Sequence, residues 1–161
     1  MTPLITTSDT INFRSIQDTD LEQVNAVEQR SAEHPWRKAH FADSLKSGYI
    51  CELAEINGTP VGHCVMMAAA GEASILILTI DKLHQRQGIG RQLLQHMTQK
   101  ATQSNCNTLL LEVRKSNNKA FNLYLHEGFS EIGIRKNYYP MGNGWEDAIV
   151  MAMELGYDDF N

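Results

Sequence analysis

The sequence has few cysteines, no long apolar run and no basic leader, and each absence excludes a class of protein. The three cysteines, Cys51, Cys64 and Cys106, are odd in number and scattered, so we expect no disulfide framework and assign the thiols to the core. No apolar run approaches the roughly 18 residues of a membrane span. Residues 1–8 lack the basic start and apolar stretch of a signal peptide. Together these absences favour a cytoplasmic protein without a membrane partner.

Positive charge is also scarce. Lys and Arg total 14 against 19 for Asp and Glu, which gives a net charge of −5. A protein that neutralises a phosphate backbone needs a surplus of cations, so we expect no direct nucleic-acid partner. Hydrophobic residues make up 42% of the 161 residues and charged residues 20%, the balance of an ordinary globular protein. We expect one domain over residues 1–161, with its core at about 11–154.

The six histidines lack the paired spacing of metal ligands. We therefore expect no metal site, and we predict that the histidine side chains lie at the surface.

The pattern of apolar residues predicts a mixed α/β sheet with interspersed helices, in the order β-α-α-β-β-β-α-β-α-β-β. Strands are expected at residues 11–16, 49–56, 60–69, 73–80, 108–113, 129–138 and 148–154. Helices are expected from a cap at Asp18 or Thr19 to about residue 30, at 37–45, at 89–104, and from a cap at Asn117 or Asn118 to a stop at Gly128. Asn57-Gly58 predicts a tight hairpin, and residues 140–144 a loop between the last two strands.

The run Gln85-Arg86-Gln87-Gly88-Ile89-Gly90 is the most informative stretch of the chain. It follows an apolar strand and opens an amphipathic helix, whose first unpaired N–H groups and dipole favour an anion. Two glycines let the backbone approach that anion closely. This 85–90 loop therefore predicts a phosphate or pyrophosphate site. A dinucleotide-binding loop would follow the first strand, whereas this one follows the fourth, and no Walker lysine pattern is present.

The element order, the 85–90 loop and the later pattern Asn117, Tyr124, Gly128-Phe129 together resemble the GCN5-related N-acetyltransferases, from about residue 11 to 154. A narrower likeness is to the RimI type, bacterial enzymes that acetylate the N-terminal alanine of a small-subunit ribosomal protein. It rests on Glu28-Gln29-Arg30, His34-Pro35-Trp36, Leu111-Glu112-Val113-Arg114, Ser116-Asn117, Arg135-Lys136-Asn137-Tyr138-Tyr139-Pro140 and Glu146-Asp147-Ala148. The resemblance implies acetyl-CoA as cosubstrate and a protein N-terminus as partner, with direct transfer in a ternary complex.

The resemblance also implies which residues hold acetyl-CoA. The pyrophosphate is expected to meet the loop and its flank at Arg86, Gln87, Gly88, Ile89, Gly90 and Arg91. The end of the preceding strand, Leu78, Thr79 and Ile80, is expected to offer backbone groups to the pantetheine and the thioester, besides packing as a core strand. Asn117 matches a CoA-contacting asparagine and fits a helix cap equally well. From the residues alone, Arg86 and Arg91 are equally well interpreted as solvated cations.

Acyl transfer to an amine needs a base for the ammonium and an acid for the leaving thiolate. Glu112 matches the general base of the RimI type. From the residues alone it is equally a solvated glutamate at a strand end, or a partner of Arg114. Tyr124 matches the tyrosine that protonates the CoA thiolate, while its apolar neighbours are typical of a core aromatic. Tyr138 and Tyr139 are candidates for the peptide groove or for half-buried packing.

Two other functions stay open at this point. The same scaffold could acetylate lysine side chains or a small amine, and a non-catalytic CoA-binding or protein-interaction module is the alternative from another class. Trp145 stands beside the expected peptide site, where relatives often carry a polar residue. Substrate specificity is therefore the least defined part of the prediction.

Overall fold

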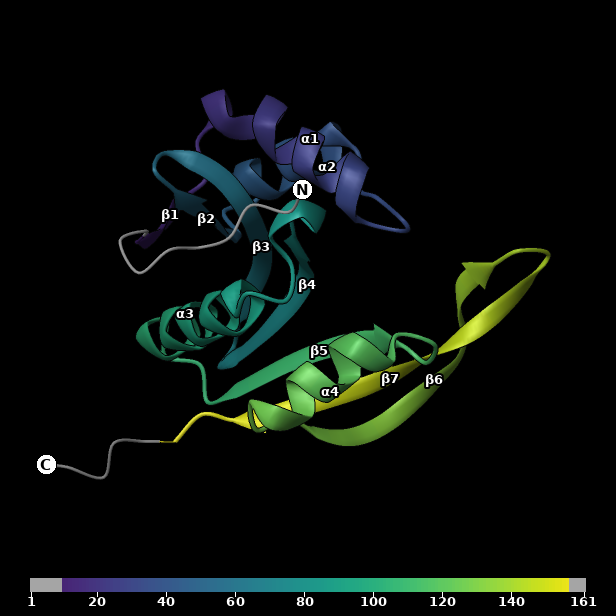
Figure 1. Ribbon diagram of the computed structural model, residues 1–161. Coiled ribbons are helices and arrows are strands. Elements are labelled where there is room, and N and C mark those ends of the chain that lie inside the picture. The colour runs from purple at the N-terminus through teal and green to yellow at the C-terminus, as the bar shows by residue number, and fades with distance from the viewer. Residues whose placement is uncertain (1–9, 157–161) are drawn as a thin grey trace, which may run out of the picture. The chain divides into compact units, whose positions relative to one another are not determined.

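The computed structural model describes residues 10–156, so the expectation about a leader at residues 1–8 falls outside the described range. The described residues form two compact units. Unit 1 contains residues 10–67 and 76–100, and unit 2 contains residues 68–75 and 101–156. Figure 1 follows the chain through its helices and strands.

Within residues 10–156, the helices and strands follow the predicted order. The strands are β1 (Ile11–Ser15), β2 (Ile50–Ile56), β3 (Thr59–Ala69), β4 (Glu72–Ile80), β5 (Thr108–Arg114), β6 (Ser130–Met141) and β7 (Gly144–Glu154). The helices are α1 (Leu21–Ser31), α2 (Lys38–Lys46), α3 (Ile89–Gln103) and α4 (Asn118–His126), with 3-10 turns η1 (Asp18–Asp20) and η2 (Lys82–His84). The strand order is β1-β2-β3-β4-β5-β7-β6, with antiparallel pairs and a parallel pair of β4 with β5. The predicted mixed α/β fold is confirmed.

The central strands of unit 1 are buried on both faces. Leu53 of β2 packs in an apolar cluster with Phe41 of α2, which also contains residues of α1. Its neighbour Ala54 packs in a second cluster with Ile89 of α3. Successive side chains of a strand point to opposite faces, so α1 and α2 cover one face of these strands and α3 covers the other. Burial on both sides explains why β3 is nearly continuously apolar instead of alternating.

The start of α1 differs from the prediction. Neither Asp18 nor Thr19 caps α1, because both belong to the 3-10 turn that precedes it. The carboxylate of Asp20 accepts the N–H of Gln17 at 2.7 Å and pairs with Arg14 at 2.8 Å. The hydrogen bond from Arg14 holds the pKa of Asp20 below its usual value. An acidic residue therefore does hold the chain just before this helix, but it stands two residues after Asp18 and one after Thr19.

The carboxylate of Glu28 in α1 has no exposed surface and joins three segments of unit 1. Its Oε1 accepts hydrogen bonds from Nε2 of His63 in β3 at 2.9 Å and from Oγ1 of Thr79 in β4 at 2.7 Å. Its Oε2 accepts the backbone N–H of Trp36, between α1 and α2, at 3.0 Å. Burial acts to raise the pKa of Glu28, but these bonds outweigh it and lower the pKa below the usual value. The prediction that the histidines lie at the surface is wrong for His63, which is 1% exposed.

The segment after β4 is anchored to the same helix. Arg30 donates to both carboxylate oxygens of Asp81, at 2.5 and 3.2 Å. The Ser31 hydroxyl accepts the N–H of Lys82 at 3.0 Å, and Asp81 accepts the N–H of Leu83 at 3.1 Å. The last turn of α1 thus fixes the chain shortly before the 85–90 loop.

Unit 2 is built on β5, β6, β7 and α4, and β4 contributes only its first residues. The registered β4–β5 pairs run from Glu72↔Thr108 to Ile75↔Leu111. By contrast, every residue of β5 is paired with β7, from Thr108↔Glu154 to Arg114↔Ala148. The end of β4, which carries the predicted pantetheine-binding residues, therefore has no part in the β4–β5 register.

Burial along β5 alternates strictly, with Leu109, Leu111 and Val113 buried and the residues between them partly exposed. The helix α4 covers the side of β5 that carries these buried residues. A Cβ added to Gly128, just after α4, would lie 3.3 Å from Sδ of Met153, the register partner of Leu109 on β7. Figure 1 shows α4 running along β5 and β7. The side chain of Glu112 therefore lies on the face of the sheet away from α4.

The last two strands are longer than predicted. β6 continues to Met141 and β7 already begins at Gly144, so the predicted loop at 140–144 is wrong. Pro140 lies within the hairpin, in register with Trp145. Proline is tolerated because β6 stands last in the strand order, where the missing N–H leaves no ladder bond unmade on its outer edge.

All three cysteines are buried and free, so the prediction that they are core residues is confirmed. Burial raises the pKa of Cys51 to about 11 and raises the pKa of Cys64 further.

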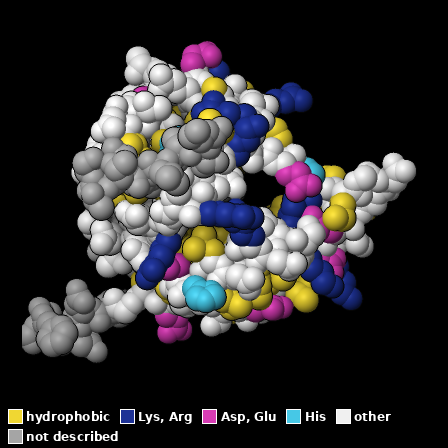
Figure 2. Space-filling model, viewed as in Figure 1, with side chains coloured by type: hydrophobic (Ala, Val, Ile, Leu, Met, Phe, Trp, Pro, Cys, Tyr) yellow, Lys and Arg dark blue, Asp and Glu magenta, His cyan; other side chains and the backbone are white. Residues whose placement is uncertain are grey.

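Elsewhere apolar side chains reach the surface, among them Ile132 and Ile134 on β6, which are 61% and 52% exposed. Figure 2 shows hydrophobic side chains among charged ones over the lower part of the viewed face. None of the described helices combines the length and apolar character needed to cross a membrane.

Gly62 in β3 lies directly against the end of β4. A Cβ at this position would come within 2.7 Å of Cδ1 of Ile80 and 3.1 Å of the carbonyl oxygen of Thr79. We expect Gly62→Ala to lower the free energy of unfolding by about 1–3 kcal/mol, because the backbone of β4 must move. Urea unfolding measures the change. Gly133→Ala is the control, since a Cβ there meets nothing within 4 Å; it should stay within about 0.5 kcal/mol. Equal losses in both variants would contradict the close approach.

We expect Glu28→Gln to lower the free energy of unfolding at neutral pH by about 2–4 kcal/mol. An amide has one acceptor oxygen, so its NH2 group must face one of the three donors that the carboxylate satisfies. Because the pKa of Glu28 is lowered on folding, its stabilisation is complete above the usual value of 4.5 and is lost as pH falls through the folded-state pKa. Urea unfolding of both proteins at several pH values should show their difference shrinking in acid.

The control for this comparison is Glu22→Gln, which removes a carboxylate of the same helix that pairs with Lys38 and is 79% exposed. Its effect should remain within about 0.5 kcal/mol. A Glu28→Gln difference that does not change with pH would show that the carboxylate is not the stabilising species.

Candidate functional site

The 85–90 loop lies in unit 1, and its backbone has the shape of an anion cradle. Arg86 and Gly88 both have left-handed backbone conformations, with φ of +62° and +80°, on either side of Gln87. Alternating backbone handedness turns successive N–H groups toward one concave side, where an anion is stabilised. Gly88 is exposed, and the 15-residue helix α3 begins at the next residue. The loop therefore presents N–H groups and the positive end of a helix dipole to solvent.

The predicted acetyl-CoA residues of the loop divide into an anchor and an exposed set. Ile89 is 1% exposed and packs against Ala54 and Val61, so its side chain holds the loop while only its backbone can contact a ligand. Arg86 and Arg91 are exposed at the surface. Gln87 and Gly90 are half-buried. The assignment of these residues to acetyl-CoA stays a prediction.

The end of β4 also presents mainly backbone groups, because several of its side chains are engaged in the core of unit 1. The Thr79 hydroxyl is already bonded to Glu28, and Ile80 packs in the same cluster as Ile89. Leu78 lies between Ile77, which packs on the face covered by α1 and α2, and Thr79. A ligand beside this segment would thus meet main-chain groups whose positions are fixed by the core of unit 1.

In unit 2, the carboxylate of Glu112 is the centre of a polar cluster on the face away from α4. Its Oε1 lies 2.7 Å from Nε of Arg135 on β6, and the carboxylate also accepts a hydrogen bond from the Tyr138 hydroxyl. That bond and the negative charge raise the pKa of Tyr138 above its usual value. The Glu112 side chain is 25% exposed. It is therefore accessible, and two donors hold it in place.

A second ion pair lies next to the first, because Arg114 follows Glu112 by two residues on the same face. Arg114 bonds Oε1 of Glu146 at 2.8 Å, which lowers the pKa of that carboxyl group. The Arg114 guanidinium also lies 4.4 Å from the centre of the Tyr139 ring. Burial, together with the charge of Glu112, raises the pKa of Tyr139 to about 12. The alternative that Glu112 merely pairs with Arg114 is wrong, since the partner of Glu112 is Arg135.

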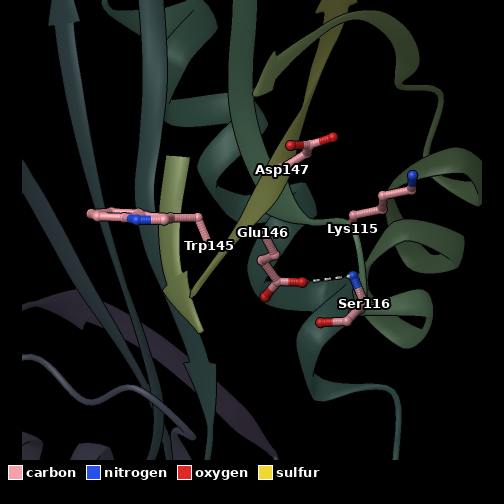
Figure 3. A pocket seen from close by; sticks show the side chains of 5 residues that line it. All are labelled: Lys115, Ser116, Trp145, Glu146 and Asp147. Carbon is pink, nitrogen blue, oxygen red and sulfur yellow. Dashed lines mark hydrogen bonds between the residues drawn. The ribbon is translucent and has the colours of Figure 1, made fainter. Parts of the chain in front are cut away.

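A shallow pocket opens beside these pairs, lined by Lys115, Ser116, Trp145, Glu146 and Asp147. The other carboxylate oxygen of Glu146 accepts the backbone N–H of Ser116 at 3.2 Å. Figure 3 shows this bond, with the Trp145 ring extending away from the other side chains. Trp145 is 60% exposed, so the hairpin presents a large apolar surface next to the charged cluster.

Tyr124 and Asn117 both come from α4 and its cap. Tyr124 is 9% exposed, and its ring packs at 5.7 Å from that of Phe129, the arrangement of a core aromatic. Oδ1 of Asn117 accepts the N–H of Ala120 at 3.1 Å, so its predicted role as helix cap is confirmed. Glu112 and Tyr124 belong to opposite sides of β5, because α4 covers the buried face. Their roles in acid and base chemistry, and a contact of Asn117 with CoA, stay predictions.

Sequence reasoning missed the partners of two acidic residues. The Glu112–Arg135 pair joins residues 23 positions apart, and the Glu28–Thr79 bond joins residues 51 positions apart. No local pattern marks either pair. The signal available for Glu28 was its position, because it lies on the face of α1 that carries the buried apolar residues Leu21, Val24 and Val27. Across residues 10–156, no three His, Cys, Asp or Glu side chains gather as metal ligands would.

The chain matches the family model of the acetyltransferase (GNAT) family over residues 13–129, which include parts of both units. It is 38% identical over 141 residues to the [ribosomal protein bS18]-alanine N-acetyltransferase of Escherichia coli K12, covering 88% of this chain and 95% of that protein. The expectation of one domain over residues 1–161 stays a prediction.

Solved structures agree with this likeness. The crystal structure of the ribosomal-protein-S18-alanine N-acetyltransferase from Escherichia coli has a TM-score of 0.86 and 36% identity, covering 94% of this chain and 98% of that chain. The structure of yncA from Salmonella typhimurium with its cofactor acetyl-CoA has a TM-score of 0.77 at 15% identity, covering 92% of this chain and 95% of that chain, a likeness that shows the fold alone. The chain thus belongs to the GNAT family of acyltransferases and, as its sequence predicts, to the RimI type within it.

Proposed function

We propose that this protein transfers an acetyl group from acetyl-CoA to the N-terminal alanine of a small-subunit ribosomal protein of the bS18 kind. The observation that carries the proposal is the 38% identity to the Escherichia coli enzyme over 88% of the chain. The matched part includes the candidate acetyl-CoA residues at 78–91 and the candidate catalytic residues Glu112 and Tyr124. Such a substrate is made in the cytoplasm, where we expect the protein to act, with no direct contact to nucleic acid or membrane. Both substrates are bound together before transfer.

The 85–90 loop fits the pyrophosphate of acetyl-CoA. Its left-handed residues Arg86 and Gly88 direct N–H groups outward, and the buried Ile89 fixes the start of α3. Arg86 and Arg91 add positive charge nearby. The backbone of Leu78, Thr79 and Ile80 would hold the pantetheine arm. Acetyl-CoA supplies the activated acetyl thioester.

The accessible carboxylate of Glu112 is suited to accept the proton of the substrate's α-ammonium. An α-amino group has a pKa of about 7.7–8.0, so roughly a tenth is already neutral at neutral pH and the base has a modest task. Tyr124 would supply the proton that the thiolate takes up, and Asn117 would contribute a contact to CoA. Because Glu112 and Tyr124 belong to opposite sides of β5, proton removal and proton supply need not compete for one position. Holding the amine and the thioester together removes most of the entropic barrier.

The loop can be tested with a branched side chain at its left-handed glycine. Gly88→Val forces a β-branched residue into a φ of +80°, which costs about 1–3 kcal/mol if the cradle keeps its shape. We expect the loop to rearrange and the affinity for acetyl-CoA, measured by isothermal titration calorimetry, to fall about tenfold or more. Gly48→Val is the matched control, because Gly48 has a φ of +76° in equally open surroundings after α2. Equal affinities of the two variants would exclude the cradle.

The catalytic assignment is tested by Glu112→Gln and Tyr124→Phe. Each should lower kcat by about 100- to 10,000-fold, since each removes one proton-transfer group, while the affinity for acetyl-CoA stays nearly unchanged. The assay follows the mass of a peptide with a free N-terminal alanine and an arginine next to it. Full turnover in both variants would overturn the assigned roles.

Two further peptides separate the alternative functions. A peptide with a blocked N-terminus and an internal lysine should not react, because an ammonium with a pKa of about 10.4 demands more of the base. Reaction of the blocked peptide alone would favour lysine acetylation. No turnover of any amine by the wild-type protein, with acetyl-CoA bound, would favour a non-catalytic module.

A further inference from the structure

The β6–β7 hairpin contains an irregularity next to Glu112. Arg135 pairs with Ala148, and the next registered pair is Tyr139 with Glu146. Between these pairs β6 advances four positions and β7 advances two, so β6 contains two extra residues. Such bulges bend a strand and redirect its side chains, and they are frequent beside active sites.

One side chain of the opposite strand holds the bulge. Asn137 has a left-handed backbone with a φ of +50°, and its N–H donates to Oδ1 of Asp147 at 2.9 Å. Asparagine tolerates this conformation better than most residues, but it persists only where surrounding contacts enforce it. The backbone of Asp147 is itself fixed, since its carbonyl oxygen accepts the N–H of Lys115 at 3.1 Å. Asp147 is thus an anchored acceptor for the strained residue.

The register shows what the bulge changes. Glu112 and Arg114 share a face of the sheet with Ala148, the partner of both Arg114 and Arg135. In a regular strand Arg135 would lie on this face and Tyr138 on the opposite one, because an odd number of positions separates them. In the bulge, Tyr138 instead reaches Glu112 with its hydroxyl, and its ring lies 5.6 Å from the Arg135 guanidinium. The two extra residues bring Tyr138 to the Glu112 face.

We propose that Asp147 is a positioning residue for the acetyl-transfer reaction, which holds the β6 bulge so that Tyr138 and Arg135 together orient the Glu112 carboxylate. Asp147 acts through the backbone of Asn137, whose N–H it accepts. The inference rests on the proposed function for its effect on turnover. Its structural part, the placement of Tyr138, can be measured without any substrate.

The test compares Asp147→Ala, which removes the acceptor, with Asp147→Asn, whose side-chain oxygen can accept the same N–H. The first readout is the titration of the Tyr138 phenol by tyrosinate absorbance, isolated by subtracting the signal of Tyr138→Phe in each background. In the wild-type protein this pKa lies above the usual value of 10.0, raised by Glu112 and opposed by the charge of Arg135. It should fall toward 10.0 in Asp147→Ala and stay raised in Asp147→Asn.

The second readout is the kinetics of the alanine-start peptide. Asp147→Ala should lower kcat by about 10- to 100-fold, since small displacements of reacting groups have effects of this size, with the KM for acetyl-CoA unchanged. Asp147→Asn should restore most of kcat. A role confined to folding would lower the amount of active protein without moving the tyrosine titration.

The outcomes distinguish the two levels of inference. A tyrosine titration that is the same in wild-type and Asp147→Ala overturns the positioning role. A shifted titration without any peptide acetylation by the wild-type protein supports the placement of Tyr138 by Asp147 and overturns the proposed substrate. Should Asp147→Ala fail to fold, hydrogen exchange of the Asn137 amide in the wild-type protein decides the question. Protection supports the bond to Asp147, and exchange at the rate of an exposed loop contradicts it.

Discussion

The buried carboxylate of Glu28 is the constraint on which the arrangement of unit 1 depends. A charge without exposed surface is tolerated only when its oxygens are satisfied, and here His63, Thr79 and Trp36 do so from three different segments. Through Glu28, the helix α1 is therefore bonded to Thr79 near the end of β4 and to Trp36 in the connection between α1 and α2. The pair of Arg30 with Asp81 continues this attachment toward the 85–90 loop. A loop that presents backbone groups to a ligand, as predicted for residues 85–90, needs such a rigid support.

Unit 2 differs from unit 1, because the polar cluster around Glu112 lies on an accessible face, with Glu112 itself 25% exposed. Two arginines alternate with two glutamates there, and each carboxylate has its own guanidinium, Arg135 for Glu112 and Arg114 for Glu146. The register of β5, β7 and β6 places all four on one face, with the fully buried Ala148 between the arginines. A larger side chain in place of this alanine would separate the two pairs. The charge pattern thus follows from strand register and not from sequence proximity.

Much of the architecture could be predicted from local signals. The Asn57-Gly58 turn, the cap at Asn117 and the stop at Gly128 act over a few residues, so their effect is visible in the sequence. The hairpin at Pro140 was predicted wrongly because a proline interrupts most strands, and only the position of β6 at the end of the sheet makes it acceptable. The edge position is a property of the whole fold.

The site shows the same division between local and distant signals. The 85–90 loop can be recognised in the sequence from its two glycines and the helix that follows. The burial of His63 and the bulge at Asn137 depend instead on partners on other elements, Glu28 and Asp147. A single sequence contains each partner but not their proximity. Resemblance to a family can indicate candidate residues, but the contacts that hold them depend on the folded arrangement of the strands and helices.

The burial of all three thiols has a practical consequence. Burial raises the pKa of Cys51 and Cys64, which suppresses the thiolate that alkylating reagents attack. A single cysteine introduced on the exposed side of the β6–β7 hairpin would therefore take up a fluorophore or spin label selectively. The native chain is already a suitable background for site-directed spectroscopy, without prior removal of its own cysteines.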